Sequence, residues 1–258
     1  MAKTWIKTRG EIERLRESGK QLAQVTHELI QAVRPGITTG KLGALAEKKI
    51  LDRGGIPIFK GYGRAWGAPP FPGAVCLSLN DEVVHGIPRD ERIVKEGDLL
   101  KIDIGMRYNG MITDMARTVC VGQVMPLAEK LQKTTEASLR AGVAILHDGA
   151  KLSEYAGAVE GVVKAAGFLC VHDLVGHGVG EELHEEPQIP NYAGSKLPNF
   201  TFRAGMVVAL EPMVNTGGWE VELAPDGWTF VTADGSLSAH WEDSVLITEK
   251  GAEVLTAL

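Results

Sequence analysis

Two aspartates, Asp103 and Asp114, lie on either side of Asn109-Gly110 in a stretch rich in Ile, Val and Thr. Asn-Gly between such runs is a strong hairpin signal, so both aspartates are expected on neighbouring antiparallel strands. With a two-residue turn they are predicted to be cross-strand partners, with Cβ atoms roughly 4.5–5.5 Å apart. Carboxylates that close repel each other unless they share a proton or a cation lies between them. A divalent metal site is one interpretation of this stretch, and a solvated polar face of a hairpin is the other.

Three later residues could complete a metal site. His177 stands among glycines, Glu211 follows an apolar strand directly before a proline, and Glu242 lies inside the last predicted strand. With Asp103 and Asp114 they supply four carboxylates and one imidazole, whose four negative charges balance two divalent cations. Oxygen donors without a thiolate favour hard or borderline metals. Two ions about 3.5–4 Å apart can hold a bridging water and polarise a carbonyl, so the implied reaction is hydrolysis.

The elements that must position these residues are predicted to be helices and antiparallel strands. Capping signals and apolar spacing predict helices over 9–33, 39–53, 126–147 and 153–166. Besides the hairpin, strands are expected at 74–79, 83–88, 170–175, 207–211, 219–223, 228–232 and 238–248. Helices followed by antiparallel strands, twice over, predict an α+β fold of two similar halves. The halves span about 1–122 and 123–258 of a single domain.

Composition restricts the class of protein. The 258 residues, 44% of them hydrophobic, are enough for one large domain with a sizeable core. Neither a run of 18 apolar residues nor an apolar leader segment occurs, so no membrane association is expected. Three scattered cysteines without a CxxC pair suit a reducing cytosol, which predicts a cytoplasmic location. The net charge of −6 gives no general attraction for nucleic acid, and no specific nucleic-acid partner is expected.

Several motifs resemble, in order and spacing, the type I methionine aminopeptidases. They are NDEVVHGIP at 80–88, KIDIG at 101–105, TDMART at 113–118, GHGVGEELHEEP at 176–187, EPMVN at 211–215, DGW at 226–228 and SAHWED at 238–243. The resemblance covers essentially the whole chain. It implies the pita-bread fold, with two pseudo-symmetric halves around a curved, mostly antiparallel sheet. It also implies removal of the initiator methionine from nascent polypeptides that carry a small second residue.

The resemblance further implies two divalent metal ions, of Co, Mn, Fe or Zn, and attack of a bridging hydroxide on the scissile carbonyl. Asp103 would chelate one ion, and Asp114 and Glu242 would bridge both. His177 and Glu211 would bind the second ion. Glu211 would also be the general base and proton shuttle, because a carboxylate beside the nucleophile can move a proton to the leaving amine.

Two further histidines, His85 and His184, would hydrogen-bond the scissile amide or the tetrahedral intermediate. By its apolar surroundings alone, His85 would be interpreted as a buried core residue. The methionine side chain would enter an apolar pocket with His85 at its edge, since aromatic surfaces suit a flexible thioether. The matching pocket positions are Tyr62, Phe71, Cys76 and Trp228.

Some positions depart from the pattern of the family. Phe59 stands where many relatives have Cys, Leu183 where they have Phe, and His240 where they often have Gln. Asp243-Ser244 replaces a frequent His-Thr, and the loop from Gly63 to Pro70, with Trp66, is longer than usual. These departures concern substrate range and metal preference, and none of them removes a metal ligand. The longer loop is interpreted as part of the substrate rim.

Three alternatives remain at this point. Xaa-Pro aminopeptidases and dipeptidases share the fold and the ligands, but they usually carry an additional N-terminal domain. Type II methionine aminopeptidases have a long helical insertion, for which the interval 184–211 leaves little room. A non-catalytic module that binds peptide, nucleic acid or a ribosome would be expected to lose ligands.

The expected partners are N-terminal methionine peptides and nascent chains. Ribosome association is compatible with such substrates, and a monomer is the default for the family.

Overall fold

The computed structural model describes residues 5–63, 69–194 and 200–257. Its helices are α1 Arg9–Ala32, α2 Thr39–Asp52, α3 Pro126–Ala144 and α4 Leu152–Ala165. Its first strands are β1 Ile56–Pro57, β2 Cys76–Leu79, β3 Glu82–Val84, β4 Leu99–Tyr108, β5 Met111–Cys120, β6 Leu169–Cys170, β7 Gly176–Gly178 and β8 Glu185–Ile189. The remaining strands are β9 Val207–Leu210, β10 Met213–Asn215, β11 Val221–Leu223, β12 Phe230–Thr232, β13 Ser238–His240, β14 Glu242–Ile247 and β15 Ala252–Val254.

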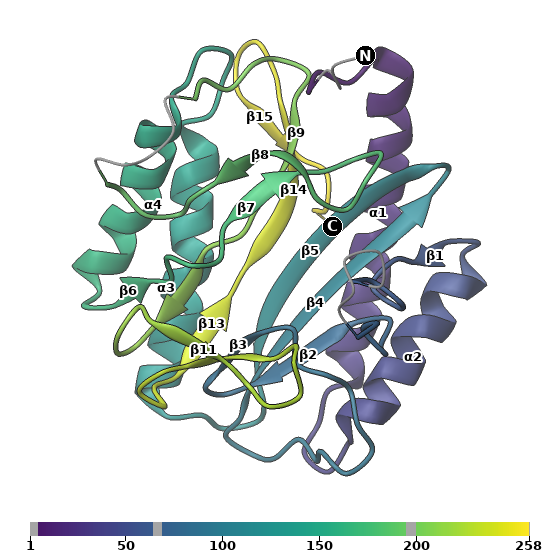
Figure 1. Cartoon of the computed structure of the whole chain (residues 1–258), viewed down its shortest axis with the longest axis vertical. Helices are drawn as coiled ribbons and strands as arrows, with labels where there is room; N and C mark the ends of the chain where they lie inside the picture. The colour runs from purple at the N-terminus through teal and green to yellow at the C-terminus, as the bar shows by residue number, and fades with distance from the viewer. Residues whose placement is uncertain (1–4, 64–68, 195–199, 258) are drawn as a thin grey trace.

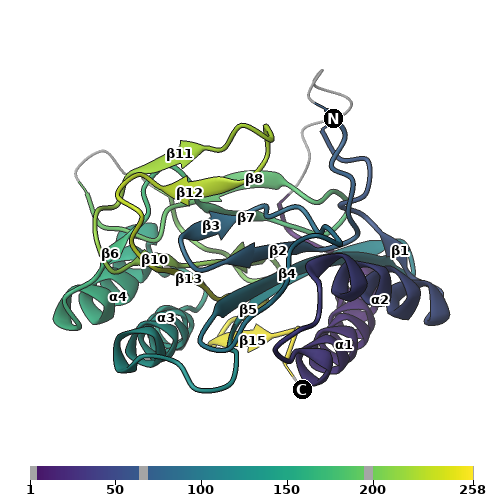
Figure 2. The same ribbon diagram turned by 90° about the horizontal axis from the view of Figure 1, so that it is seen from below.

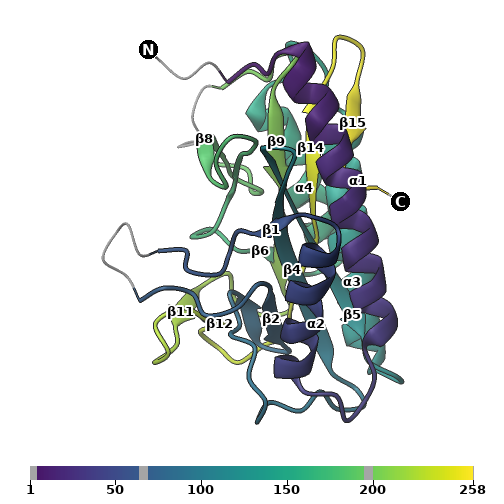
Figure 3. The same ribbon diagram turned by 90° about the vertical axis from the view of Figure 1, so that its right-hand side faces the viewer.

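A nine-stranded antiparallel sheet is the centre of the described part of the chain. Its main path runs β1-β4-β5-β14-β9-β7-β8, with β2 paired to β4 and β15 paired to β14. In Figure 1 the pair α3 and α4 lies at the left, the pair α1 and α2 at the right, and the strands of this sheet run through the middle of the view. In the turned views the helices lie on one side of the sheet, and β11 and β12 lie on the other (Figures 2 and 3). The expected α+β class is therefore confirmed.

Local signals determine where the first helix begins. The backbone N–H of Glu11 donates to Thr8 Oγ1 at 3.3 Å, and the Thr8 N–H donates to Glu11 Oε2 at 2.6 Å. This reciprocal capping box satisfies N–H groups that the helix itself leaves without partners. One face of α1 is buried through Leu15, Leu22 and Leu29. Helix α1 is therefore held by its cap and by the apolar stripe that the sequence predicts.

Each pair of helices covers its own hydrophobic core. Leu22 of α1 and Leu42 of α2 belong to one buried cluster with Ile102 of β4. A second cluster joins α3 and α4 to β9 and β14, and Tyr155 is its largest fully buried side chain. The two halves meet where β5 pairs with β14. A boundary near residue 122 within a single domain stays a prediction.

The last predicted strand is divided in the structure. Residues 238–248 were expected to be continuous, but the chain breaks at Trp241. Strand β13 pairs with β10 in a small three-stranded sheet, while β14 joins the main sheet. The predicted strand at 170–175 is similarly reduced to β6. The pattern of apolar residues could not show these breaks, because each depends on which distant strand is available for pairing.

Among the described residues, no helix is long and apolar enough to span a bilayer.

Candidate active site

The hairpin of β4 and β5 places its two aspartates diagonally across from each other. Asn109 and Gly110 have φ values of 49° and 81° and form a two-residue turn. Asp103 pairs with Ala116, and Asp114 pairs with Gly105. The prediction that the aspartates are direct partners is therefore wrong, because their midpoint lies one residue away from the centre of the turn. They still share a face, and diagonal neighbours lie roughly 7–8 Å apart, which leaves room for a cation between them.

The acidic face of this hairpin is buried. Asp103 is 8% exposed and Asp114 is 4% exposed. The other face of β4 is buried too, through Leu100, Ile102 and Ile104. The interpretation as a solvated polar face is therefore wrong. Buried carboxylates require compensation by a cation, a proton or hydrogen bonds.

Five neighbouring strands bring the five predicted metal ligands together. Asp103 lies on β4, Asp114 on β5, Glu242 on β14 and His177 on β7, and Glu211 follows β9 directly. These strands are consecutive neighbours in the sheet order β4-β5-β14-β9-β7. The carboxylates therefore form a row across the sheet, and the row spans both halves of the fold.

The strand register aligns this row. Ala116 pairs with Asp103 on one side and with Glu242 on the other. Asp243 pairs with Leu210, so Glu242 lies beside the residue that follows Leu210, which is Glu211. The small side chain of Ala116 separates the carboxylates of Asp103 and Glu242 without filling the space between them.

The donor atoms fit a divalent cation. One ligand atom from each of Asp114, His177 and Glu242 lies within 4.8 Å of the other two. Glu242 Oε1 is buried and has no hydrogen-bond partner. Asp103 and Glu211 lie outside this tight group but line the same cavity. An unpartnered buried carboxylate oxygen beside further carboxylates is the arrangement that a bound cation would satisfy.

The hydrogen bonds of His177 determine which ring nitrogen faces the cluster. Its Nδ1 lies 2.8 Å from the carbonyl oxygen of Gly178, so Nδ1 carries the proton and donates it. The free lone pair is then on Nε2, which lies 3.3 Å from Glu211 Oε1. Metal-binding histidines are commonly oriented by a backbone carbonyl in this way. Burial lowers the pKa of His177 to about 3, which keeps the ring neutral and able to bind a cation.

Burial and mutual repulsion disfavour the ionised state of the carboxylates. Burial raises the pKa of Asp103 to about 7. The pKa values of Asp114 and Glu242 lie well above their ordinary range because of burial and the charges of neighbouring carboxylates. The pKa of Glu211 is raised for the same reasons. Without a cation the cluster therefore holds protons at neutral pH.

We expect metal to stabilise the protein more at pH 8 than at pH 5. A carboxyl group whose pKa is raised by folding stabilises the fold fully below its unfolded pKa, and this stabilisation is lost as the pH rises through the folded pKa. For Asp103 the loss runs from its unfolded pKa to about 7. A cation replaces the protons, so its binding strengthens with pH.

Thermal unfolding with EDTA and with MnCl₂ between pH 5 and pH 8 measures this difference. Asp103→Asn is the control. In its metal-free form, the melting temperature should fall less with rising pH than that of the wild-type protein. A melting temperature of the metal-free protein that rises steadily over this range would contradict the expectation.

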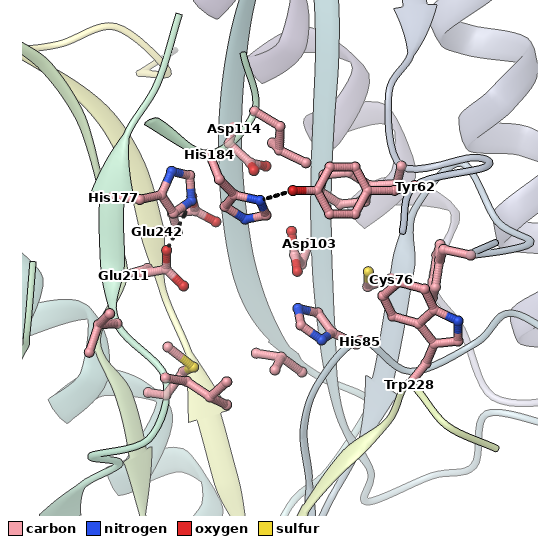
Figure 4. A pocket seen from close by; sticks show the side chains of 17 residues that line it. Tyr62, Cys76, His85, Asp103, Asp114, His177, His184, Glu211, Trp228 and Glu242 are labelled. Atoms are coloured by element: carbon pink, nitrogen blue, oxygen red, sulfur yellow. Dashed lines mark hydrogen bonds and ion pairs between the residues drawn. The ribbon is translucent and has the colours of Figure 1, made fainter. Parts of the chain in front are cut away.

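A cavity of about 150 Å³ lies over the carboxylate row. All the predicted site residues line it, namely Tyr62, Phe71, Cys76, His85, Asp103, Asp114, His177, His184, Glu211, Trp228 and Glu242. In Figure 4, His177 and Glu211 approach from one side and Cys76, His85 and Trp228 from the other, with Asp103 and Asp114 between them. The structure therefore assembles the predicted set in one place.

The apolar end of the cavity is built around aromatic rings. Phe71 and Trp228 pack edge to face with centroids 5.4 Å apart, and Trp228 Nε1 donates to the carbonyl oxygen of Pro69 at 3.0 Å. Cys76 pairs with Asp103 across β2 and β4, which connects this apolar end to the carboxylate row. Burial raises the pKa of the Cys76 thiol, so it remains neutral. This end of the cavity can accept an apolar side chain.

His85 enters the cavity because the chain leaves β3 with an unusual backbone conformation. Its φ of 59° is in the left-handed region, which non-glycine residues rarely adopt. The ring packs against Phe230 and Trp228 at centroid distances of 5.8 and 6.3 Å. Burial lowers the pKa of His85 to about 4. The interpretation of His85 as a buried core residue is wrong, because His85 is only half-buried and its ring lines the cavity with the carboxylates.

His184 lies between the carboxylate row and Tyr62. Its Nδ1 hydrogen-bonds with the Tyr62 hydroxyl, and its ring packs edge to face with His177 at 4.4 Å between centroids. Burial lowers the pKa of His184 to about 4. The loop that carries it is held by Glu185, whose carboxylate accepts from Lys7 Nζ at 2.6 Å in a nearly buried ion pair. His184 is therefore a neutral, well-positioned imidazole.

Several departures from the family pattern take part in the site. Asp243 accepts from Arg117 at 2.6 Å and from the Thr256 hydroxyl at 2.6 Å. The Ser244 hydroxyl accepts from the Asp114 N–H and donates to the Asp114 carbonyl, which joins β14 to β5. Trp66 lies outside the described residues.

Sequence reasoning missed some residues of the site. Arg117 was not singled out, although TDMART was, and its guanidinium donates to the carbonyl oxygen of Glu242. Strand β5 holds only two charged residues, Asp114 and Arg117, three positions apart, so its pattern gives no signal that Arg117 contacts the neighbouring strand. The remaining cavity-lining residues, of which Phe59 and Leu183 were noted only as departures, are Phe59, Val84, Leu174, Val175, Leu183 and Met213. An apolar residue carries no signal that distinguishes a cavity wall from a core.

Comparisons with known proteins agree on one family. Residues 13–249 match the model of metallopeptidase family M24. A methionine aminopeptidase of Clostridium perfringens is 42% identical over 98% of this chain and 98% of its own. The crystal structure of methionine aminopeptidase from Thermotoga maritima superimposes with a TM-score of 0.93, at 40% identity over 98% and 99% of the two chains. A prolidase from Pyrococcus furiosus, 23% identical, has a TM-score of 0.76 over 65% of its length and shares the fold.

Proposed function

Because the chain belongs to metallopeptidase family M24, we propose that the cavity over the carboxylate row is the active site of a methionine aminopeptidase. Curated methionine aminopeptidases are 42% identical to it over nearly the full length. The chain is a hydrolase that uses divalent metal to remove the N-terminal methionine of a polypeptide, and it has the pita-bread fold. The observation that carries the proposal is the row of buried carboxylates with His177 at one end of an aromatic cavity.

The residues of the row would hold two ions. Asp103 would hold one ion, His177 and Glu211 would hold the other, and Asp114 and Glu242 would be shared by both. Divalent ions held there would supply an activated water and polarise the scissile carbonyl. The donor set of four carboxylates and one imidazole suits cobalt, manganese, iron or zinc, so the identity of the metal depends on availability.

The remaining polar groups handle protons and position the substrate. Glu211 accepts the proton of the nucleophile and delivers it to the leaving amine. His184 and His85 are neutral rings whose N–H groups donate to the scissile amide and to the oxyanion as it forms. Burial of Glu211 supports this role, because a raised pKa lets its carboxylate hold a proton transiently.

The aromatic end of the cavity takes the methionine side chain. Tyr62, Phe71, Cys76 and Trp228 line this end. A cavity of about 150 Å³ is large enough for a benzene-sized group. The second residue of the substrate then lies beside His85 and His184, where we expect a small side chain to be preferred.

The proposed activity suggests a physiological setting. We expect a monomeric enzyme in the cytoplasm whose substrates are nascent chains. Association with the ribosome is an additional expectation that such substrates suggest.

Release of free methionine from Met-Ala-Ser tests the function. Metal-stripped protein is resupplied with CoCl₂ or MnCl₂ and assayed beside Ala-Pro-Ala. We expect metal-dependent cleavage of Met-Ala-Ser alone. Cleavage of Ala-Pro-Ala alone would assign the chain to the Xaa-Pro branch of the fold. No cleavage of either peptide, together with no bound metal, would indicate a binding module.

A further inference from the structure

His240 is a buried histidine beside the carboxylate row. It lies at the end of β13 and is 1% exposed. Neither of its ring nitrogens has a hydrogen-bond partner among the described residues. Its Nε2 lies 3.7 Å from Glu211 Oε2 and 4.0 Å from Glu242 Oε2. His240 therefore contacts the carboxylates without being one of the residues that line the cavity.

The two oxygens of Glu211 face two different imidazoles. Oε1 lies 3.3 Å from His177 Nε2, and Oε2 is the oxygen nearest to His240. A carboxylate that keeps one oxygen for a cation and has the other held by an N–H donor is fixed in orientation. His177 cannot be that donor, because its Nδ1 proton is donated to the Gly178 carbonyl.

The surroundings of His240 favour the tautomer with the proton on Nε2. A proton on Nδ1 would bury an N–H group without a partner and would point the Nε2 lone pair at two carboxylates. A proton on Nε2 meets an acceptor instead. With its proton on Nε2, His240 is a donor aimed at Glu211.

We propose that His240 is a positioning residue that donates a hydrogen bond from Nε2 to Oε2 of Glu211 and thereby sets the affinity of the metal site. It acts through Glu211, so the inference rests on the proposed role of Glu211 as a ligand. The separation of 3.7 Å exceeds an ordinary N–H···O distance by roughly 0.5–1 Å, so the proposal requires Glu211 and His240 to approach by that amount when the carboxylate is oriented for a cation. Loss of a residue that orients a metal ligand typically weakens metal binding by about 10–100-fold.

Titration of the metal-free full chain with CoCl₂, by calorimetry and by the visible absorption of bound cobalt, tests this role. His240→Leu removes the donor and His240→Gln keeps an N–H donor. Ser238→Ala, on the same strand, removes a buried hydroxyl that donates to the carbonyl oxygen of Val214. We expect His240→Leu to bind cobalt about 10–100-fold more weakly. His240→Gln and Ser238→Ala should stay within a few-fold of wild type, with an unchanged KM for Met-Ala-Ser.

Two results would overturn the inference. One is wild-type cobalt affinity and spectrum in His240→Leu. The other is equal weakening in His240→Gln and His240→Leu, which would assign the effect to ring packing. Melting temperatures of the metal-free variants show whether they fold. If His240→Leu does not fold, the cobalt affinity of His240→Gln still tests the inference. Failure of the proposed function is distinguishable, because the wild-type protein itself would then bind no cobalt or would bind cobalt without releasing methionine from Met-Ala-Ser.

Discussion

Replacing Glu242 with Gln is expected to remove metal binding and methionine release together, each by at least about 100-fold. Glu242 lies in the middle of the carboxylate row, between β5 and β9, and its Oε1 has no hydrogen-bond partner in the part of the chain that the structure describes. An amide supplies no charge and only one oxygen to a cation. Loss of a group that merely orients a ligand already costs about 10–100-fold, so loss of a bridging ligand costs more.

The same substitution should stabilise the metal-free protein as the pH rises above neutral, where the cluster loses the protons that it holds. Glu242 is almost fully buried beside Asp114 and Glu211, whose charges repel its own. Removing one charge from such a cluster relieves this repulsion. Metal content measured by elemental analysis and thermal unfolding with EDTA check both expectations. Glu253→Gln, in an exposed ion pair with Arg16, is the control. Normal metal content and activity in Glu242→Gln would contradict a site that depends on this bridge.

Replacing His184 with Ala is expected to lower kcat by about 10²–10³-fold, the usual cost of one donor to a developing oxyanion. His184 lies at the cavity beside Tyr62, while the carboxylates and His177 are the proposed ligands. Metal content should therefore remain at the wild-type level. This separation of turnover from metal binding distinguishes a group that contacts substrate from a ligand.

Kinetics with Met-Ala-Ser and elemental analysis of the same preparations measure this separation. His172→Ala is a matched control, because His172 stacks between Tyr192 and Trp219 at 4.0 and 4.5 Å and is not part of the cavity lining. Tyr62→Phe shows how much of the effect comes from the hydrogen bond that orients the ring. Loss of metal from His184→Ala would mean that His184 is a ligand.

The alternatives within the family differ in how much of each relative's length this chain matches. Relatives at 42% identity match 98% of this chain and 98% of their own length. The prolidase structure is matched over 65% of its length. Residues 185–210 contain β8 and β9 and the segment 195–199 that lies outside the described residues. This chain therefore agrees with the methionine aminopeptidases in both length and sequence, whereas it shares only the fold with the prolidase.

Local chemistry made part of this protein predictable from its sequence. The capping box at Thr8 and the Asn109-Gly110 turn depend on contacts within a few residues, so helix α1 and the hairpin could be expected nearly to the residue. The ligand types could also be expected, because a carboxylate in an apolar strand, as at Glu211, has to be compensated by something.

Only the tertiary structure decided how these residues meet. The sequence could not show the order β4-β5-β14-β9-β7, because the pairing of β5 with β14 joins segments more than a hundred residues apart. It also could not show the diagonal offset of Asp103 and Asp114, the left-handed backbone at His85 or the break at Trp241. Strand register and strand breaks are selected by packing across the whole sheet rather than by neighbouring residues. The sequence alone therefore determined which carboxylates and imidazoles are present. The pairing of the strands determined that Ala116 lies between Asp103 and Glu242 and that His240 faces Glu211.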